Sequence, residues 1–154
     1  MSLAPRELAL DSADVMHYLD EIGAPDSVRT AYLRQLPVGG ARRWRERYAK
    51  HAVAFVRASS PMRPAPARDS SWAEPVGLAL ELVPERDPTA LRAGDTLVVR
   101  LLRRGAPAAD VAVALVGGGR TDALTARTDA EGRVRWRLPR AGRWMARATD
   151  LRRA

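Results

Sequence analysis

The sequence predicts a mainly β protein, with a β-sandwich over residues 74–150 and a small helical segment before it. Apolar residues alternate with other residues in several short segments after residue 74, as they do when successive side chains of a strand point to opposite faces. Turn-forming residues separate these segments at regular intervals. No helical periodicity lies between them, which favours a sandwich over a parallel α/β sheet.

The clearest strand pattern runs from residue 128 to residue 145. Asp129–Gly132 has turn chemistry, because Asp can bond its own backbone and Gly tolerates a positive φ. After this turn an apolar face alternates with an arginine face, and a second turn at residues 139–142 leads to a return strand. The segment therefore predicts a β-hairpin in one wall of the sandwich. Its apolar face is Val134, Trp136 and Leu138, and its arginine face is Arg133, Arg135 and Arg137.

Four further sets of alternating residues predict the remaining strands of the sandwich. Turns are expected at residues 84–91, 93–95 and 103–107, and a flexible tip at Gly117–Gly119. The fourth set, which leads into the hairpin, is Leu124, Ala126 and Thr128. The expected inward residues of the other three sets are Val76, Leu78, Leu80 and Leu82; then Leu97, Val99 and Leu101; and then Val111, Val113 and Leu115.

Two short helices are expected before residue 36. Asp11 or Ser12 is a good N-cap for a helix that reaches Ile22, and Gly23 can end it. Val15, Tyr18, Leu19 and Ile22 would share one face of this helix at helical spacing. Asp26 is the expected cap of the second helix, which would carry Val28, Ala31, Tyr32 and Gln35.

A proline-rich stretch divides the chain. Residues 59–73 contain three prolines without any periodicity, which is typical of an exposed linker. The predicted organisation is a helical and single-strand segment at 1–58, the linker at 59–73, and the sandwich at 74–150. The single strand is expected over His51–Arg57, because Val53, Phe55 and Val56 favour extended structure.

Composition limits the classes of function. The net charge is +8 and the isoelectric point about 11.2, and Lys50 is the only lysine, so the positive charge is almost entirely arginine. This balance admits nucleic-acid binding, although codon bias toward Arg, Ala, Gly and Pro also produces it. Without cysteine there is no disulfide and no thiolate chemistry. No apolar run approaches the length of a membrane span, and residues 1–10 do not have the pattern of a signal peptide.

A combination of short motifs over residues 45–150 resembles a family of exported bacterial proteins of unknown function. Some members of that family resemble periplasmic components of nickel or cobalt uptake. The later half also resembles transthyretin-like and carboxypeptidase-regulatory-like sandwich modules, so the expected fold is a sandwich of transthyretin or immunoglobulin type. The resemblance implies a periplasmic or otherwise exported protein whose targeting segment is absent from this chain. The motifs are Tyr48-x-Lys50, Gly77-x-x-Leu80-Glu81-x-Val83-Pro84-x-x-Asp87-Pro88, Gly94-Asp95-x-Leu97, Gly105-x-Pro107, Thr128-Asp129-x-x-Gly132 and Gly142-x-Trp144-Met145.

His17 and His51 are the candidate metal ligands, since they are the two histidines of the chain. A site for a first-row metal would also need carboxylates such as Asp14, Asp20, Glu21 or Glu81. His17 and Glu21 are four residues apart on the expected helix. The favoured explanation is the simpler one, in which His17 lies on a solvated helix face and His51 is an ordinary strand histidine. The resemblance makes nickel and cobalt the ions to test, and no other cofactor is expected.

The candidate interaction face is the row Arg133, Arg135 and Arg137, joined by Arg100 and Arg127 if their strands lie alongside. Such a row suits an anionic partner, whereas alternating charge also simply keeps an exposed sheet face soluble. The strand over Arg143–Thr149 is expected at an open edge of its sheet, where it would pair with the 48–57 segment, a protein partner or a second copy.

The motifs do not predict an enzyme. The serines have no Gly-x-Ser-x-Gly setting, and Gly117–Arg120 lacks the residues that complete a phosphate-binding loop. The sequence therefore favours a non-enzymatic binding or accessory module of the cell envelope. The alternative is a cytoplasmic, arginine-rich module that binds nucleic acid or protein, and a metal-dependent enzyme is a third, weaker interpretation.

Overall fold

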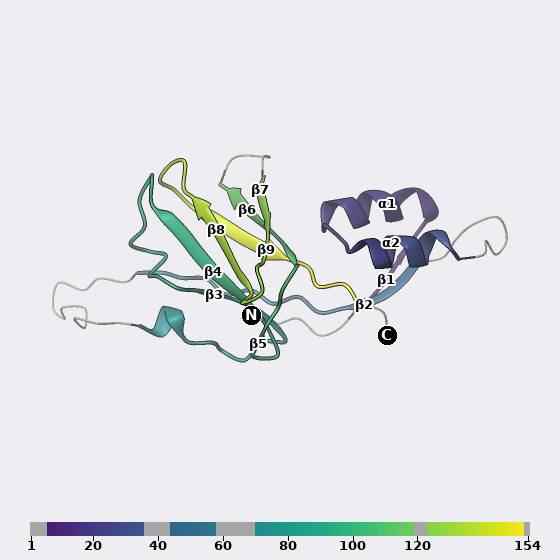
Figure 1. Ribbon diagram of the computed structural model, residues 1–154, viewed down its shortest axis with the longest axis horizontal. Helices are drawn as coiled ribbons and strands as arrows, with labels where there is room; N and C mark the ends of the chain where they lie inside the picture. The colour runs from purple at the N-terminus through teal and green to yellow at the C-terminus, as the bar shows by residue number, and fades with distance from the viewer. Residues whose placement is uncertain (1–5, 36–43, 58–69, 119–122, 153–154) are drawn as a thin grey trace. The chain divides into compact units, whose positions relative to one another are not determined.

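The structure is a computed structural model that describes residues 6–35, 44–57, 70–118 and 123–152 (Figure 1). The chain forms two compact units. One contains residues 1–52 together with 148–154, and the other contains residues 53–147. Most of the predicted linker, residues 59–69, lies outside the described residues, so its role as a domain boundary stays a prediction.

The first unit combines two helices with a two-stranded sheet in its described part. Its elements are β1 (Arg6–Leu10), α1 (Ser12–Glu21), α2 (Asp26–Leu33) and β2 (Trp44–Tyr48). Strands β1 and β2 are antiparallel, with Arg6 opposite Tyr48 and Leu10 opposite Trp44. The sequence does not predict β1.

The ends of α1 follow the capping chemistry of the sequence. A side-chain oxygen of Asp11 accepts a hydrogen bond from the backbone N–H of Asp14 at 3.1 Å, and this satisfies one of the free donors of the first turn. Gly23 has a φ of 60° just after the helix and ends it. The predicted cap of α2 is wrong by one position: Pro25 is the N-cap and Asp26 is the first helical residue, where its charge favours the helix dipole.

The helices of this unit bury one apolar face around a small core. Val15, Leu19, Val28 and Tyr32 are buried there, and Trp44 of β2 packs against them. The Tyr32 and Trp44 rings meet edge to face, with centroids 5.9 Å apart. The core therefore uses the apolar spacing that predicts the helices.

Tyr18 links α1 to β2 at the margin of this core. Its hydroxyl donates a hydrogen bond to a carboxylate oxygen of Glu46 at 2.8 Å. Burial of the Tyr18 hydroxyl and its contact with the Glu46 carboxylate raise the pKa of Tyr18 above its ordinary value. Arg29 fixes the connection between the helices, because its guanidinium donates to the carbonyl of Leu19 and pairs with Asp20.

The predicted strand over His51–Arg57 is wrong. The strand in this region is β2, at Trp44–Tyr48, and after His51 the chain has no regular secondary structure through residue 57. Val56 is 83% exposed. β-branched residues favour a strand only where neighbouring side chains pack against them. Strand propensity alone therefore predicted the strand at the wrong position.

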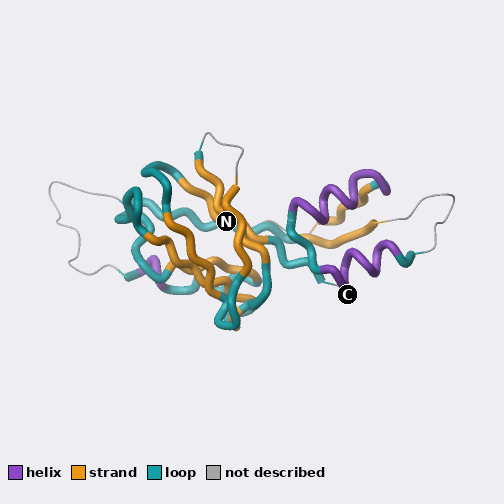
Figure 2. The backbone as a smooth tube through the Cα atoms, turned by 45° about the horizontal axis from the view of Figure 1, so that its top comes forward, coloured by secondary structure: helices purple, strands orange, loops and turns teal. Residues whose placement is uncertain are grey.

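The second unit is a β-sandwich (Figure 2). In its described residues, β4 pairs with β3, β5 and β8 in one antiparallel sheet, and the other sheet has the order β7-β6-β9. A 3₁₀ turn at Ser71–Ala73 precedes the first strand. The strands are β3 (Leu80–Pro84), β4 (Thr96–Arg103), β5 (Ala106–Pro107), β6 (Ala112–Gly117), β7 (Ala123–Arg127), β8 (Arg133–Arg137) and β9 (Trp144–Ala148).

The core of the sandwich is formed by the predicted alternating residues of three strands. All of them are buried, and the remaining core is also mainly aliphatic. In β8 the pattern is strict, since Val134 and Trp136 are buried and the arginines between them are not. The confirmed inward residues are Leu97, Val99, Leu101, Val111, Val113, Leu115, Val134, Trp136 and Leu138.

Strand β3 departs from its predicted position. It begins at Leu80, and Val76 is 65% exposed. Leu82 lies opposite Leu101 on the core side, as expected. However, Glu81 and Val83, which share the opposite face of the sheet, are the buried residues of this strand. Both faces of β3 are therefore covered. Leu124 of β7 is 42% exposed.

The predicted hairpin of residues 128–145 is wrong, because its two strands belong to different sheets. Strand β8 pairs with β4, with Leu97 opposite Trp136, and β9 pairs with β6. The backbone N–H of Leu138 donates to the carbonyl of Asp95 at 2.9 Å, which continues the β4–β8 ladder to the start of the second turn. The turn at residues 139–142 therefore carries the chain across the sandwich instead of back along β8.

Candidate functional site

The outer surface of β4 and β8 carries a group of arginines that we call the arginine face. Arg133, Arg135 and Arg137 occupy alternate positions of β8, on the side opposite to Val134 and Trp136. Arg100 of β4 lies directly opposite Arg133, and residues that face each other in an antiparallel pair share a side of the sheet. The arginine face is thus Arg100, Arg133, Arg135 and Arg137.

Acidic neighbours balance part of this charge. The Arg133 Nε atom donates to Glu85 Oε1 at 2.7 Å, and this contact raises the pKa of Arg133 above its ordinary value. Arg135 Nη1 lies 3.6 Å from Asp129 Oδ2, a looser ion pair. In the described part of the chain Arg137 makes no ion pair. The face therefore keeps an excess of positive charge.

The arrangement of Arg100 and Arg133 is the electrostatically costly feature of the face. Like charges directly opposite each other on neighbouring strands are destabilising. The Arg100 Nε atom is also enclosed, and it has no hydrogen-bond partner among the described residues. A bound carboxylate or another anion would lower the repulsion, because it supplies negative charge and accepts guanidinium hydrogen bonds.

Arg127, expected to extend the row, belongs elsewhere. It lies on β7, in the other sheet, and its Nε atom donates to Asp110 Oδ1 at 2.6 Å. The neighbouring guanidinium lowers the pKa of Asp110 below its ordinary range. Arg127 instead ties β7 to the turn before β6, because it also donates to the Asp110 carbonyl.

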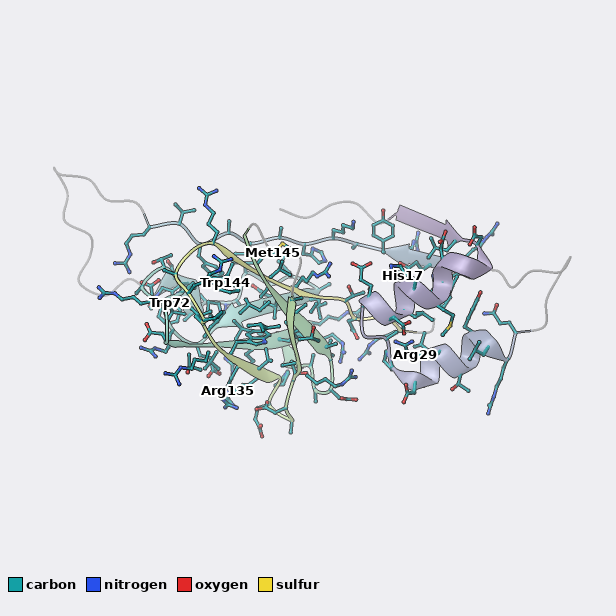
Figure 3. All side chains as sticks on the ribbon, turned by 90° about the horizontal axis from the view of Figure 1, so that it is seen from above. His17, Arg29, Trp72, Arg135, Trp144 and Met145 are labelled. Carbon is teal, nitrogen blue, oxygen red and sulfur yellow. The ribbon has the colours of Figure 1, made fainter. Side chains whose placement is uncertain are left out.

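Neither candidate metal ligand belongs to a cluster of three or more metal-binding side chains in the described residues. His17 is exposed on α1 (Figure 3), and His51 follows β2. Across the described ranges, no group of three or more His, Asp or Glu side chains is placed to hold one ion. Glu21 lies one helical turn after His17, at the end of α1.

Glu81 has a structural role, whereas the sequence suggested it as a possible carboxylate ligand of a metal site. It is buried, and its oxygens accept hydrogen bonds from the backbone N–H groups of Val76, Gly77 and Leu78 at 2.6, 3.1 and 3.2 Å. Gly77 has a φ of 84°, which turns these donors toward one side chain. Glu81 therefore anchors the segment that leads into β3. The alternating pattern placed Glu81 in a continuous strand, and for this reason the sequence did not predict its role as a buried hydrogen-bond acceptor.

The remaining sequence candidates lie in ordinary structural settings. Ser27 is on α2, Ser71 is in the 3₁₀ turn, and Ser59 and Ser60 lie outside the described residues. Gly118 follows β6, where its carbonyl accepts a hydrogen bond from Arg140 at 3.0 Å. The same Arg140 guanidinium lies over the Trp144 ring, 5.1 Å from its centroid, in a contact that the sequence does not predict.

Comparisons with known proteins assign the chain to a protein family. A family model described as "Domain of unknown function (DUF4198)" matches residues 11–150. No curated protein and no solved structure matches the chain. Neither helix of the described part is long and apolar enough to cross a membrane.

Proposed function

The chain belongs to the DUF4198 family of domains of unknown function, and we propose that it is a non-enzymatic binding or accessory module of the cell envelope. The arginine face of the sandwich is its binding surface in this proposal. The partner is an acidic protein segment. The resemblance of residues 45–150 to exported bacterial proteins supports a periplasmic or otherwise exported location.

The observation that carries the proposal is the concentration of guanidinium groups on two neighbouring strands. Arg135 and Arg137 are exposed, and Arg100 faces Arg133 across the ladder. Arginine presents a planar set of donors that matches a carboxylate, so an acidic partner gains hydrogen bonds as well as charge attraction. These strands pair in one sheet, which fixes the spacing of the backbone positions that carry the arginines.

Reversal of charge on this face should abolish most of the binding to an acidic polypeptide. We expect labelled polyglutamate to bind the chain at low salt and to bind the Arg135→Glu/Arg137→Glu variant at least about tenfold more weakly, as charge reversal at an interface is costly. Fluorescence anisotropy at low and physiological salt measures both affinities. Affinity should fall with salt in each case, because the contacts are exposed.

The matched control places the same change on another exposed strand. Arg45 and Arg47 are exposed residues two positions apart on β2, so Arg45→Glu/Arg47→Glu lowers the net charge equally, from +8 to +4. This variant should keep binding within about threefold, the range of a surface charge outside the interface. Equal losses in the two variants would show that net charge alone attracts the polymer, and the proposed surface would be wrong.

The same assay tests the cytoplasmic alternative, a module that binds nucleic acid. Its support is the arginine-rich composition of the chain and its net charge of +8. Binding that depends only on phosphate charge falls steeply with salt. Sequence-selective DNA binding that survives physiological salt would favour this alternative over the envelope module.

A connection to nickel or cobalt uptake is carried by the sequence resemblance alone. Calorimetric titration with Ni²⁺ and Co²⁺ is expected to give no tight binding, because a first-row metal site needs several converging ligands. Stoichiometric binding that disappears in the His17→Ala/His51→Ala variant would contradict this expectation and would make the chain a metal-binding component.

A further inference from the structure

Strand β8 lies at the edge of its sheet and carries the arginine face. Among the described strands it pairs with β4 alone. An edge strand presents one row of backbone N–H and C=O groups that its own sheet does not use. The residues that own these groups can be identified from the hydrogen-bond pattern of the ladder.

In an antiparallel ladder, residues whose backbone bonds across to the neighbour alternate with residues whose backbone points away. At one end of the β4–β8 ladder the Leu101 N–H donates to the Gly132 carbonyl at 2.7 Å, and at the other the Leu138 N–H donates to the Asp95 carbonyl. Val134 and Trp136 lie at the alternate positions between Gly132 and Leu138, so their backbone groups also point toward β4. The backbone groups of Arg133, Arg135 and Arg137 therefore point to the open edge.

One of these three positions is already occupied. The Arg133 N–H donates to Asp129 Oδ1 at 2.7 Å, and its carbonyl accepts from the Asp129 N–H at 2.9 Å. Arg135 and Arg137 are left with outward N–H and C=O groups that no described residue bonds. Their side chains lie beside this edge, and that of Arg135 extends away from the sandwich (Figure 3).

The charge of the edge selects the strand that can join it. An identical β8 from a second copy would bring arginine against arginine, which is destabilising, so self-pairing is disfavoured. If a strand with carboxylates at alternate positions paired with β8, all of its carboxylates could lie on the same face of the sheet as Arg135 and Arg137, because side chains alternate between the two faces along a strand. The backbone and the side chains of β8 thus favour the same partner.

We propose that β8 is a docking edge for an extended acidic segment of another protein, which adds to the sheet as a strand beside Arg135 and Arg137. This inference rests on the proposed function and specifies how the acidic partner binds. Strand addition of this kind takes affinity from main-chain hydrogen bonds and specificity from alternate side chains.

The substitution that isolates the backbone contribution is Arg135→Pro, compared with Arg135→Ala. Both remove the guanidinium, but only proline removes the N–H group. That N–H does not take part in the β4–β8 ladder, and proline is tolerated at such edge positions. The probe is a fluorescent short peptide that alternates threonine and glutamate. Its affinity should fall about two- to fivefold in Arg135→Ala, as for an exposed ion pair. It should fall about fivefold further in Arg135→Pro, through the lost hydrogen bond and the blocked edge.

A second arm uses the unaltered protein and therefore does not depend on the folding of the proline variant. The same peptide with N-methyl groups on alternate residues keeps its charge but cannot form a ladder. We expect it to bind at least about fivefold more weakly than the parent peptide. Equal binding of the two peptides, or equal losses in Arg135→Ala and Arg135→Pro, would refute strand addition while leaving an electrostatic arginine face intact. Failure of the parent peptide and of polyglutamate alike would refute the proposed function as well.

Discussion

Replacement of Trp136 by alanine is expected to lower the free energy of unfolding of the sandwich by about 3–5 kcal/mol, the usual cost of truncating a buried Trp or Phe. Trp136 is 6% exposed and lies opposite Leu97 across the β4–β8 ladder. Its removal would leave a cavity between the sheets, and the neighbouring side chains can fill it only in part. Chemical denaturation followed by circular dichroism measures the change.

Two comparisons show whether the effect comes from burial. Arg135→Ala, on the opposite face of the same strand, should change stability by no more than about 0.5 kcal/mol. Trp136→Phe should cost much less than Trp136→Ala, because the enclosed indole nitrogen has no hydrogen-bond partner in the described structure to lose. A larger loss in Arg135→Ala than in Trp136→Ala would mean that the faces of β8 are reversed.

Glu81→Ala should give the second largest loss of stability, about 1.5–3 kcal/mol, as expected for hydrogen bonds to a charged group. The substitution deprives the N–H groups of Val76, Gly77 and Leu78 of their shared acceptor. Val76 and Gly77 are exposed, so water can replace part of what they lose and the three contributions should not add. The same denaturation experiment measures this loss, and faster hydrogen exchange at residues 76–78 would locate it.

The control for Glu81 is an exposed carboxylate in the same segment. Glu74→Ala removes an equal charge from a side chain exposed to solvent, and it should change stability by less than about 0.5 kcal/mol. Equal effects of the two substitutions would indicate that charge balance, and not the three backbone hydrogen bonds, stabilises this segment.

Much of the sandwich could be predicted because one face of its strands is buried. Alternation places every second residue inside, so Val134 and Trp136, or Leu97 and Val99, already indicate their strand and its inward face. The first helix was equally predictable, since Asp11 and Gly23 mark its ends chemically.

The pairing of strands could not be predicted in the same way. A strand, a turn and another strand predict a hairpin locally, but the choice between returning along β8 and crossing to β6 depends on contacts distant in sequence. The buried carboxylate of Glu81 was missed for a related reason. Its hydrogen-bond donors lie in a turn around Gly77, where the alternating pattern indicated a continuous strand.

The arginine face was predictable in part. Alternation alone puts Arg133, Arg135 and Arg137 on one side of a strand. Whether Arg100 and Arg127 join them depends on which strands are neighbours. The register brings Arg100 opposite Arg133 and leaves Arg127 in the other sheet.

The central claim, that the edge and outer face of β8 bind an acidic segment, is tested most directly by mapping the binding site on the protein. Amide chemical shifts are recorded by NMR while the threonine–glutamate peptide is added. We predict that the changes concentrate at Arg133–Arg137 and at Arg100 opposite them, and that the Arg135 and Arg137 amides become protected from hydrogen exchange. Changes that instead concentrate on α1 or β2, or that are absent from β8 at saturation, would contradict the claim.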